Sequence, residues 1–380
     1  MKIYATGTVH NEQDIIESLC RHIMQFCDGM VVCDNHSTDN TRDIILKLVG
    51  EGLNIHLIEG FKNSHTRAQI AFDQFNADLV LPTDADEFLF RDGGGNPRAI
   101  LETLNPEVEY SIPWRSYVFT QESERGTQFL PERFPFRLLN EVKQYDKVVI
   151  SRKIWKTFAC TLFPGNHFLV FENSKDRDAV PAMSMSSLYY AHYPIRSRLQ
   201  AIQKCVEHEF LLSSRADRFQ GEGYQYKRWL DRIIQTGALT VDETSQFSIR
   251  YNIPDSMSDA QMQIVEDPPD TSFAGEAILL KYSNYSINEK DVFKRVVAEA
   301  YRLICAQAEA LRKEKLINIA LQELAVLEGF FMKAPEEKIK QEASYISERV
   351  KFNLERLDKT DAQLASRFEA IFFRIKKYLE

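Results

Sequence analysis

The first ninety or so residues alternate between short apolar runs and amphipathic stretches. The apolar runs predict strands over 2–9, 30–33, 54–58 and 78–82, and apolar positions at helical spacing predict helices over 12–26, 41–49 and 64–75. Strands and helices that alternate with short connections indicate a parallel sheet with helices on both faces. In such sheets, ligands bind at the edge where the strands' carboxyl ends meet.

From about residue 97 the pattern becomes mixed. We predict a short helix over 97–104, strands over 109–119, 133–139, 147–150, 168–171 and 188–192, and a helix over 195–213. Prolines punctuate this zone, which suits a mixed extension of the sheet. Residues 214–288 are less regular, and apolar stripes from 291 to the end predict a bundle of three or four antiparallel helices.

These patterns predict an α/β fold with three parts. A mostly parallel sheet with a mixed edge is expected over 1–220, an irregular connecting region over 221–288, and a helical bundle or interaction domain over 289–380.

Polar clusters follow three of the predicted strands: Thr8 to Glu12, Asp34 to Asp39, and Asp84 to Glu87. The last cluster puts three carboxylates within four residues, where like charges repel and raise one another's pKa. A divalent cation bound to a phosphorylated ligand would relieve that repulsion. Taken alone, the cluster could equally be a solvated acidic turn, but the coincidence of three polar strand ends favours a binding site.

Composition limits the class of protein. The chain is 44% hydrophobic and 27% charged, which is typical of a globular protein, and its net charge of −8 argues against a nucleic-acid partner. Its six cysteines lack metal-ligand spacing and are expected to be buried thiols. No apolar run reaches the roughly 18 residues of a membrane helix, and the N-terminus lacks a signal-peptide core, so we expect a cytoplasmic location.

Several motifs occur in order along the chain: Thr8 to Glu12, Val31 to Thr41, Arg67 to Gln69, Thr83 to Phe88, and Leu188 to Ser197 followed by Lys204. With them, roughly the first 210 residues resemble family 2 glycosyltransferases of the GT-A fold, in the branch whose metal motif reads DADEF. The resemblance implies a nucleotide-sugar-binding sheet. It also implies transfer of a hexose from a nucleoside-diphosphate donor, expected to be a UDP-sugar, to a hydroxyl acceptor in surface glycan or polysaccharide synthesis.

The resemblance implies a metal site at the acidic cluster. Sugar transfer from a nucleoside diphosphate creates a doubly negative leaving group, which Mn²⁺ or Mg²⁺ would stabilise. Asp86 is our first choice for a direct ligand and Asp84 the next, because an extended segment would place both carboxylates on one side. His192 matches the downstream histidine that completes the metal shell in such enzymes, and His167 is a weaker rival. A core histidine and a solvated acidic turn are the structural alternatives.

The remaining donor contacts also rest on the resemblance. Asp34 would pair with the nucleobase and Thr8 with the base or ribose, which Asp84 could also reach. Arg67, Arg196 and Lys204 would lie near the phosphates, where a guanidinium offers paired donors. An Asx turn is the alternative for Asp34, and a surface helix arginine is the alternative for Arg67.

The general base is the least defined role. An inverting reaction needs a carboxylate within hydrogen-bond reach of the acceptor hydroxyl. We choose Glu132, with Glu87 beside the metal motif as the other catalytic candidate and Glu122 and Glu124 as rivals. The family's acidic-pair motif is not recognisable, which leaves inversion or retention open. Trp114 could stack on a sugar, although a buried aromatic is the simpler interpretation.

Other functions stay open. A nucleotidyltransferase is one alternative, although no Gly-rich basic loop follows the first strand; a non-catalytic sugar-nucleotide-binding scaffold is another. The helical tail could pack as a bundle, mediate a homo-oligomer, or contact the inner face of a membrane through its basic, aromatic end, Arg367 to Tyr378.

Overall fold

The protein is described from a computed structural model. The described residues are 1–60, 62–124, 129–163, 165–213, 223–251, 253, 262–274, 278–282, 317–318, 320–322, 324–325, 327–328, 335–356 and 362–379. The chain forms two compact units, Met1–Glu299 and Ala300–Glu380, and each is described by itself.

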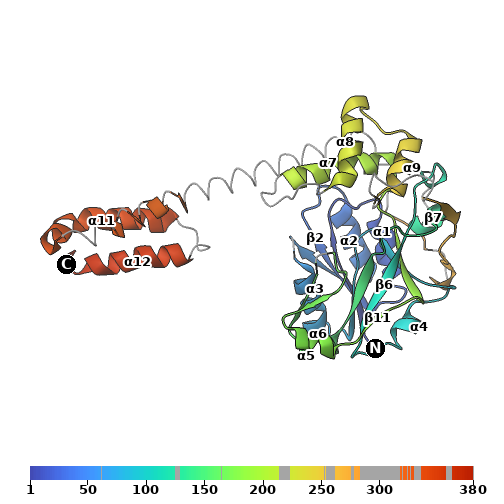
Figure 1. Cartoon of the computed structure of the whole chain (residues 1–380), viewed down its shortest axis with the longest axis horizontal. Coiled ribbons are helices and arrows are strands. Elements are labelled where there is room, and N and C mark those ends of the chain that lie inside the picture. The colour runs from blue at the N-terminus through green and yellow to red at the C-terminus, as the bar shows by residue number, and fades with distance from the viewer. Residues whose placement is uncertain are drawn as a thin grey trace. The chain divides into compact units, whose positions relative to one another are not determined.

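Strands and helices alternate through the first part of the chain, as predicted (Figure 1). The elements are β1 (Ile3–Val9), α1 (Ile16–Ile23), β2 (Gly29–Asp34), α2 (Thr41–Gly50), β3 (Ile55–Glu59), α3 (Ser64–Asp73), β4 (Leu79–Pro82), β5 (Glu87–Arg91) and α4 (Arg98–Leu101). The strand over β5 was not predicted, because Glu87 to Arg91 begins inside the acidic cluster. Its apolar run, Phe88 to Phe90, is only three residues long and carries a charge at each end.

The later part of this unit contains shorter elements. They are β6 (Glu109–Ser116), η1 (Glu122–Glu124), η2 (Leu130–Arg133), β7 (Phe136–Leu138), β8 (Asp146–Ser151), α5 (Arg152–Thr157), β9 (Cys160–Leu162), β10 (Leu169–Phe171), α6 (Ser174–Ala179), β11 (Ala182–Ser184), β12 (Leu188–His192), α7 (Arg198–Ser213), α8 (Tyr224–Thr236), α9 (Val241–Ile249), β13 (Ile264–Glu266) and η4 (Ser272–Ala274).

One large sheet orders the unit. Its strand order is β3-β2-β1-β4-β8-β6-β12-β5, with β11 paired to β6. The strands β1 to β4 are parallel, whereas β8 runs antiparallel to both β4 and β6, and β5 is antiparallel to β12. The predicted α/β class, with a mostly parallel half and a mixed edge, is therefore confirmed.

Both faces of the sheet are covered by apolar side chains. On one face, α1 and α2 pack with residues such as Ile16, Ile45 and Val32, and on the other face α3 and α5 pack with Ala68, Phe72 and Val148. Such burial is the main driving force for the fold. Five of the six cysteines fall in the described residues, and all five are free and buried, as predicted.

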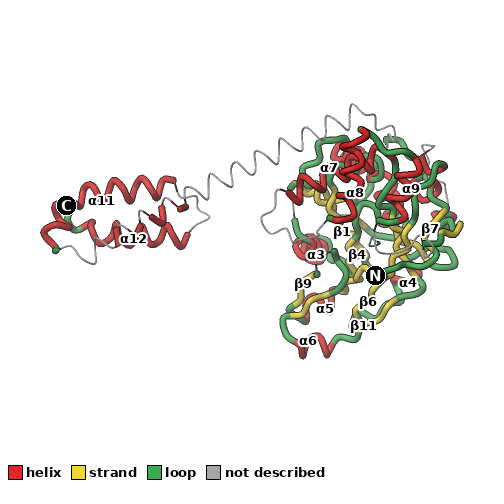
Figure 2. Tube along the Cα trace, turned by 45° about the horizontal axis from the view of Figure 1, so that its top comes forward, coloured by secondary structure: helices red, strands yellow, loops and turns green. Residues whose placement is uncertain are grey.

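Helices α7, α8 and α9 gather at the end of the sheet where β12 leads into α7 (Figure 1). Figure 2, like Figure 1, places α5 and α6 near β11, at the end of the sheet away from these helices. The structure differs here from the expected irregular region over 221–288, because α8 and α9 occupy much of 224–249. Their signals are local: Gly237 ends α8 with a positive φ of 76°, and Thr240 and Glu243 form a capping box for α9.

The second unit contains α11 (Glu336–Arg356) and α12 (Ala362–Lys376). The two helices share an apolar core with helical residues between 317 and 328; its buried members are Ala320, Leu324, Leu327, Ile346, Val350, Phe368, Ile371 and Ile375. A helical region is confirmed, and the predicted stripe over 293–304 lies outside the described residues. In the described part of the chain, no helix combines the length and apolarity needed to cross a membrane.

Candidate active site

The acidic motif forms the turn that joins β4 to β5. The Thr83 N–H donates to the Thr6 carbonyl at 2.9 Å, and the chain then turns at Ala85 and Asp86. The Asp84 N–H closes this turn by donating to Glu87 Oε2 at 2.9 Å. The expectation of an extended segment is therefore wrong, and the turn gives the two aspartates different partners.

Asp84 and Glu87 share a buried lysine from the neighbouring strand β8. The side chain of Lys147 is only 1% exposed, and its Nζ lies 2.6 Å from Asp84 Oδ2 and 3.0 Å from Glu87 Oε1. It also donates to the Gly165 carbonyl at 2.9 Å. Burial lowers the pKa of Lys147, but the two carboxylates outweigh burial and hold this pKa above its ordinary value, so the ammonium stays charged.

Asp86 faces His192 and Lys204. Its Oδ2 lies 3.7 Å from His192 Nε2 at the end of β12 and accepts a hydrogen bond from Lys204 Nζ of α7 at 3.1 Å. The His192 ring stacks on Trp114 with centroids 4.3 Å apart. The structure thus brings together three of the predicted site residues, and it uses Trp114 as the support of His192.

The charges around Asp86 have defined states. Burial alone would raise the pKa of Asp86, but Lys204, His192 and Arg196 together outweigh burial and hold this pKa well below its usual range. Burial lowers the pKa of His192 to about 4, so the imidazole is neutral at pH 7. Lys204 also donates to the Pro194 carbonyl at 3.0 Å and lies 5.0 Å from the centre of the Tyr251 ring. The site therefore combines an ionised carboxylate, a neutral imidazole and an ammonium group.

Arg196 ties the loop after β12 to the loop after β1. Its Nε donates to Asp14 Oδ2 at 2.7 Å, and its Nη2 donates to Asp14 Oδ1 at 3.0 Å and to Glu12 Oε2 at 2.5 Å. Its Nη1 is buried and has no hydrogen-bond partner among the described residues. Burial raises the pKa of Glu12 to about 8 against the opposing charge of Arg196. Arg196 thus positions the loop after β1, and its phosphate contact stays a prediction.

Thr8, Asp34 and Arg67 lie at the carboxyl edge of the parallel strands or beside it. Thr8 pairs with Cys33, and Thr8 Oγ1 is buried with no hydrogen-bond partner in the described part of the chain. Asp34 is buried at the end of β2 and accepts from the Ser37 N–H at 3.1 Å, which is the Asx-type contact named as its alternative.

Arg67 is a buried residue of α3, not a surface arginine. It donates to the Lys62 carbonyl and, at 2.9 Å, to Ser64 Oγ. Burial lowers the pKa of Arg67, and the charge of Asp84 opposes that effect. Arg67 and Asp84 are therefore near enough to interact electrostatically, while the contact of Arg67 with phosphate stays a prediction.

The candidate bases lie in different surroundings. Glu132 is exposed in η2 and accepts from Thr271 Oγ1 at 3.4 Å, and Glu124 accepts from Arg198 Nε at 2.7 Å. These contacts do not join either residue to the acidic motif. Glu87 is buried against Lys147, and burial raises its pKa while Lys147 opposes the rise. The catalytic roles of Glu132 and Glu87 stay predictions.

Sequence reasoning missed three residues at this edge: Lys147, Asp14 and Glu141. Glu141 accepts from the Ser116 N–H at 2.6 Å and from Ser116 Oγ at 2.8 Å, and Ser116 pairs with His192 in the sheet. Burial raises the pKa of Glu141. No local motif marks these residues, because each acts through partners from distant parts of the sequence.

The chain was compared with family models, curated proteins and solved structures. No family model matches the chain, and no curated protein matches it. Among solved structures, the chain is similar to S. aureus TarS 1–349 in complex with UDP, at 13% identity over 100% of this chain and 89% of that chain, with a TM-score of 0.33.

Two further similar structures come from other organisms. The mannosyltransferase PcManGT of Pyrobaculum calidifontis, in complex with GDP-Man and Mn²⁺, matches at 15% identity over 80% of this chain and 87% of that chain, with a TM-score of 0.33. Glucosyl-3-phosphoglycerate synthase of Mycobacterium tuberculosis, in complex with Mn²⁺, UDP and glucosyl-3-phosphoglycerate, matches at 14% identity over 63% and 81%, with a TM-score of 0.30. At these scores and identities we base no conclusion on the likenesses.

The geometry of the acidic motif indicates whether its side chains could hold a divalent ion. In the part of the chain that the structure describes, no group of three His, Cys, Asp or Glu side chains is arranged to hold a metal ion. However, Asp86 Oδ2 and His192 Nε2 are 3.7 Å apart, and two donors at about 2.1 Å from one ion lie roughly 3 to 4 Å apart. Mg²⁺ is commonly held by one or two carboxylates together with substrate phosphates. The donor set therefore fits an ion that binds together with a diphosphate.

Proposed function

We propose that this chain is a family 2-like glycosyltransferase of the GT-A fold, which transfers a sugar from a nucleoside-diphosphate donor, a UDP-sugar, to a hydroxyl acceptor. One observation carries the proposal. The DADEF motif follows the parallel strand β4 at the carboxyl edge of the sheet, and neutral His192 and charged Lys204 converge on its Asp86. The proposed setting, surface glycan or polysaccharide synthesis, rests on the sequence resemblance.

Different residues of the chain would bind different parts of the donor. Asp84, Asp86 and His192 would hold Mn²⁺ or Mg²⁺, which when bound would offset the negative charge of the departing diphosphate. Lys204 would add a fixed positive charge beside the same phosphates. Thr8 and Asp34 would contact the nucleoside, with Arg67 and Arg196 on the phosphate side.

The acceptor must lose a proton during transfer. As the acceptor oxygen bonds to the anomeric carbon, the bond from that carbon to the diphosphate oxygen breaks, and a carboxylate takes the hydroxyl proton. Glu132 and Glu87 stay our candidates for this base, and the contact between Glu141 and Ser116, beside His192, adds Glu141 to them. Replacing each glutamate by glutamine and measuring kcat would assign the role. Loss of the general base should lower kcat at least about a hundredfold and leave donor binding unchanged.

A thermal-shift screen of nucleoside diphosphates, with and without Mn²⁺, tests the proposal. We expect UDP with Mn²⁺ to raise the melting temperature, because a ligand that binds only the folded state stabilises it. Asp86→Ala should abolish the metal-dependent part of the shift, whereas Asp92→Ala, at a half-exposed carboxylate paired with Arg115, should keep it. If no nucleoside diphosphate gives a metal-dependent shift, the transferase proposal is wrong.

A second candidate is binding of a sugar nucleotide without transfer. It is favoured by one observation, namely that lysine side chains already neutralise Asp84 and Asp86. In that case UDP would stabilise the protein equally with Mn²⁺ and with a chelator. Donor turnover in the presence of acceptor glycans would be undetectable.

A further inference from the structure

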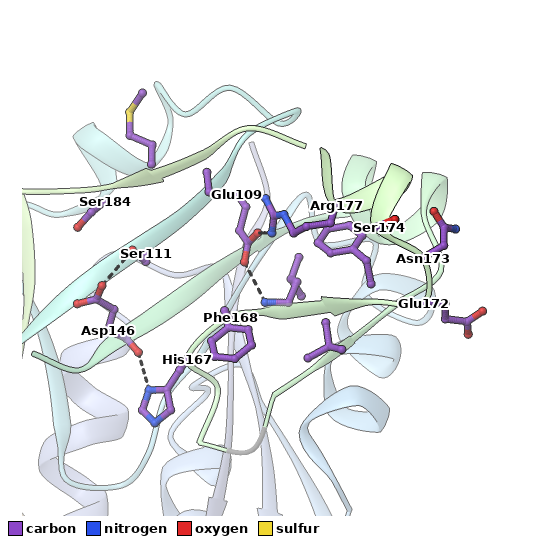
Figure 3. A pocket seen from close by; sticks show the side chains of 15 residues that line it. Glu109, Ser111, Asp146, His167, Phe168, Glu172, Asn173, Ser174, Arg177 and Ser184 are labelled. Carbon is purple, nitrogen blue, oxygen red and sulfur yellow. Dashed lines mark hydrogen bonds and ion pairs between the residues drawn. The ribbon is translucent and has the colours of Figure 1, made fainter. Parts of the chain in front are cut away.

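A cavity of about 790 Å³ lies beside β6, on the side where β10, β11 and α6 surround it (Figure 3). Its lining combines apolar and polar side chains from these four elements and from the start of β8. The volume falls within the range of small-molecule binding sites. None of the residues proposed above for the donor lines this cavity, so it is a separate feature of the fold.

Apolar side chains are exposed on one side of the cavity. Phe168, Val170 and Met183 are 46%, 42% and 56% exposed, and apolar and aromatic side chains of this kind predominate in the lining of ligand pockets. The Phe168 ring stacks on Phe163 with centroids 4.4 Å apart, which holds it in place. This side therefore offers a fixed aromatic face to a ligand.

The polar lining has one unused acceptor. Asp146 Oδ2 accepts a hydrogen bond from Ser111 Oγ at 3.3 Å, while Asp146 Oδ1 is buried and has no hydrogen-bond partner among the described residues. Oδ1 itself is closed to solvent, so Asp146 is available to a ligand as one polar residue of the lining through its more open part. Ser184 adds a hydroxyl to the same lining (Figure 3).

The charges in the cavity argue against an anionic ligand. Its basic residue, Arg177, is already paired with Glu109, which also accepts from the Leu169 N–H at 2.9 Å (Figure 3). Asp146 and the exposed Glu172 leave the lining acidic. A neutral ligand that carries both hydroxyl groups and apolar faces suits this combination, and sugar rings have both.

One loop connects the cavity to the acidic motif. Gly165 accepts from Lys147 Nζ, which pairs with Asp84, and two residues later His167 lines the cavity. His167 Nδ1 lies 2.8 Å from the Asp146 carbonyl oxygen, as Figure 3 shows. Asp146 itself precedes Lys147 in the chain. The part of the cavity lined by Asp146 and His167 therefore lies next to elements of the proposed donor site, whereas α6 and β11 lie at the end of the sheet away from α7 (Figure 1 and Figure 2).

We propose that this cavity binds the acceptor of the transfer and that the acceptor is a neutral oligosaccharide. Its apolar ring faces pack on Phe168, and its hydroxyl groups hydrogen-bond polar side chains of the lining, Asp146 and Ser184 among them. This inference rests on the proposed function, since it names the acceptor class of the same enzyme.

An array of neutral and acidic oligosaccharides, probed with the full chain, tests the inference. We expect binding to neutral oligosaccharides, and we expect Phe168→Ala and Asp146→Asn each to weaken that binding about tenfold through loss of stacking or of a charged acceptor. Ile234→Ala is the matched control, because Ile234 is 73% exposed on α8 and does not line the cavity. UDP with Mn²⁺ should stabilise wild type, both cavity variants and the control alike.

The outcomes separate the two proposals. If UDP with Mn²⁺ stabilises the protein but no neutral oligosaccharide binds, or only acidic ones bind, the cavity inference is wrong and the transferase proposal stands. Neutral glycans that bind wild type and both cavity variants equally would also overturn it. If neither UDP nor any oligosaccharide binds, both proposals are wrong.

Discussion

Lys147 shows how one buried charge fixes the geometry of the acidic motif. Its ammonium holds Asp84 and Glu87 together on the turn between β4 and β5. We expect Lys147→Met to lower the free energy of unfolding by about 3–5 kcal/mol, because it leaves the buried Glu87 without its counter-charge. Urea denaturation would measure this loss. Lys153→Met removes an exposed pair with Glu107 and should cost less than about 1 kcal/mol; equal losses in both variants would contradict the argument.

His22 predicts an acid-sensitive step in stability. It is fully buried among phenylalanine rings, its Nε2 lies 2.8 Å from the Leu89 carbonyl oxygen, and burial lowers its pKa from 6.5 to about 3. Between pH 6.5 and about 3, His22 therefore binds a proton in the unfolded chain but not in the folded state. The stability contributed by neutral His22 is thus present above pH 6.5 and falls as the pH drops from 6.5 towards 3.

The size of this effect can be measured. We expect His22→Gln to remove about 1.4 kcal/mol per pH unit from the pH dependence of the unfolding free energy between pH 4 and 6. Urea titrations at several pH values would show it. His56→Gln, at an exposed position of β3, is the control, and an unchanged slope in His22→Gln would refute the assignment.

At the scale of elements, the contact between β1 and β4 places the acidic motif. Gly7 of β1 passes so close to β4 that a Cβ there would lie 2.8 Å from the Thr83 carbonyl oxygen. Because two backbones meet at this point, no side-chain rotation relieves the clash. We expect Gly7→Ala to destabilise the protein by about 1–3 kcal/mol and to weaken UDP binding by moving Asp84.

A second glycine provides the matched control for that change. A Cβ at Gly50, at the end of α2, meets nothing within 4 Å. Gly50→Ala should therefore leave UDP binding unchanged and keep or raise stability, by up to about 1 kcal/mol. Thermal shift with UDP and Mn²⁺ would compare the two variants, and similar behaviour of both would show that close packing at Gly7 is unimportant.

Element prediction succeeded where a segment is long and its pattern periodic. The helices α2 and α3 and the strands β1 to β4 were predicted to within a residue or two at most ends, because their apolar positions repeat at one clear spacing. The strands β5, β9, β11 and β13 were missed. Each is short, and β5, β11 and β13 pair with strands distant in the sequence, which a local pattern does not record, whereas β9 pairs with the nearby β10.

At the scale of the whole molecule, the residues proposed for the donor site all belong to the first compact unit, Met1–Glu299. We therefore expect a chain that ends at residue 299 to keep its stabilisation by UDP and Mn²⁺. Thermal shift on the truncated chain would check this, and loss of the shift in a chain that still unfolds cooperatively would show that the second unit contributes to the site.

The same truncation tests the role of the helical tail. Sedimentation of the full and truncated chains compares their assembly states. If the tail builds a homo-oligomer, the truncated form should contain fewer subunits than the full-length form. If both forms keep the same assembly state, the tail does not mediate oligomerisation.

The sequence alone determined the α/β class, the alternation of the first 90 residues and the candidate residues Asp86, His192 and Lys204, because periodicity and motif order are properties of the chain itself. Tertiary structure decided the partners. The turn at Ala85 separated Asp84 from Asp86, and strand pairing brought Lys147 to one of them and His192 to the other. Burial then set their charges. Desolvation and ion pairing depend on which distant segments meet in the fold, and no local pattern of residues records them.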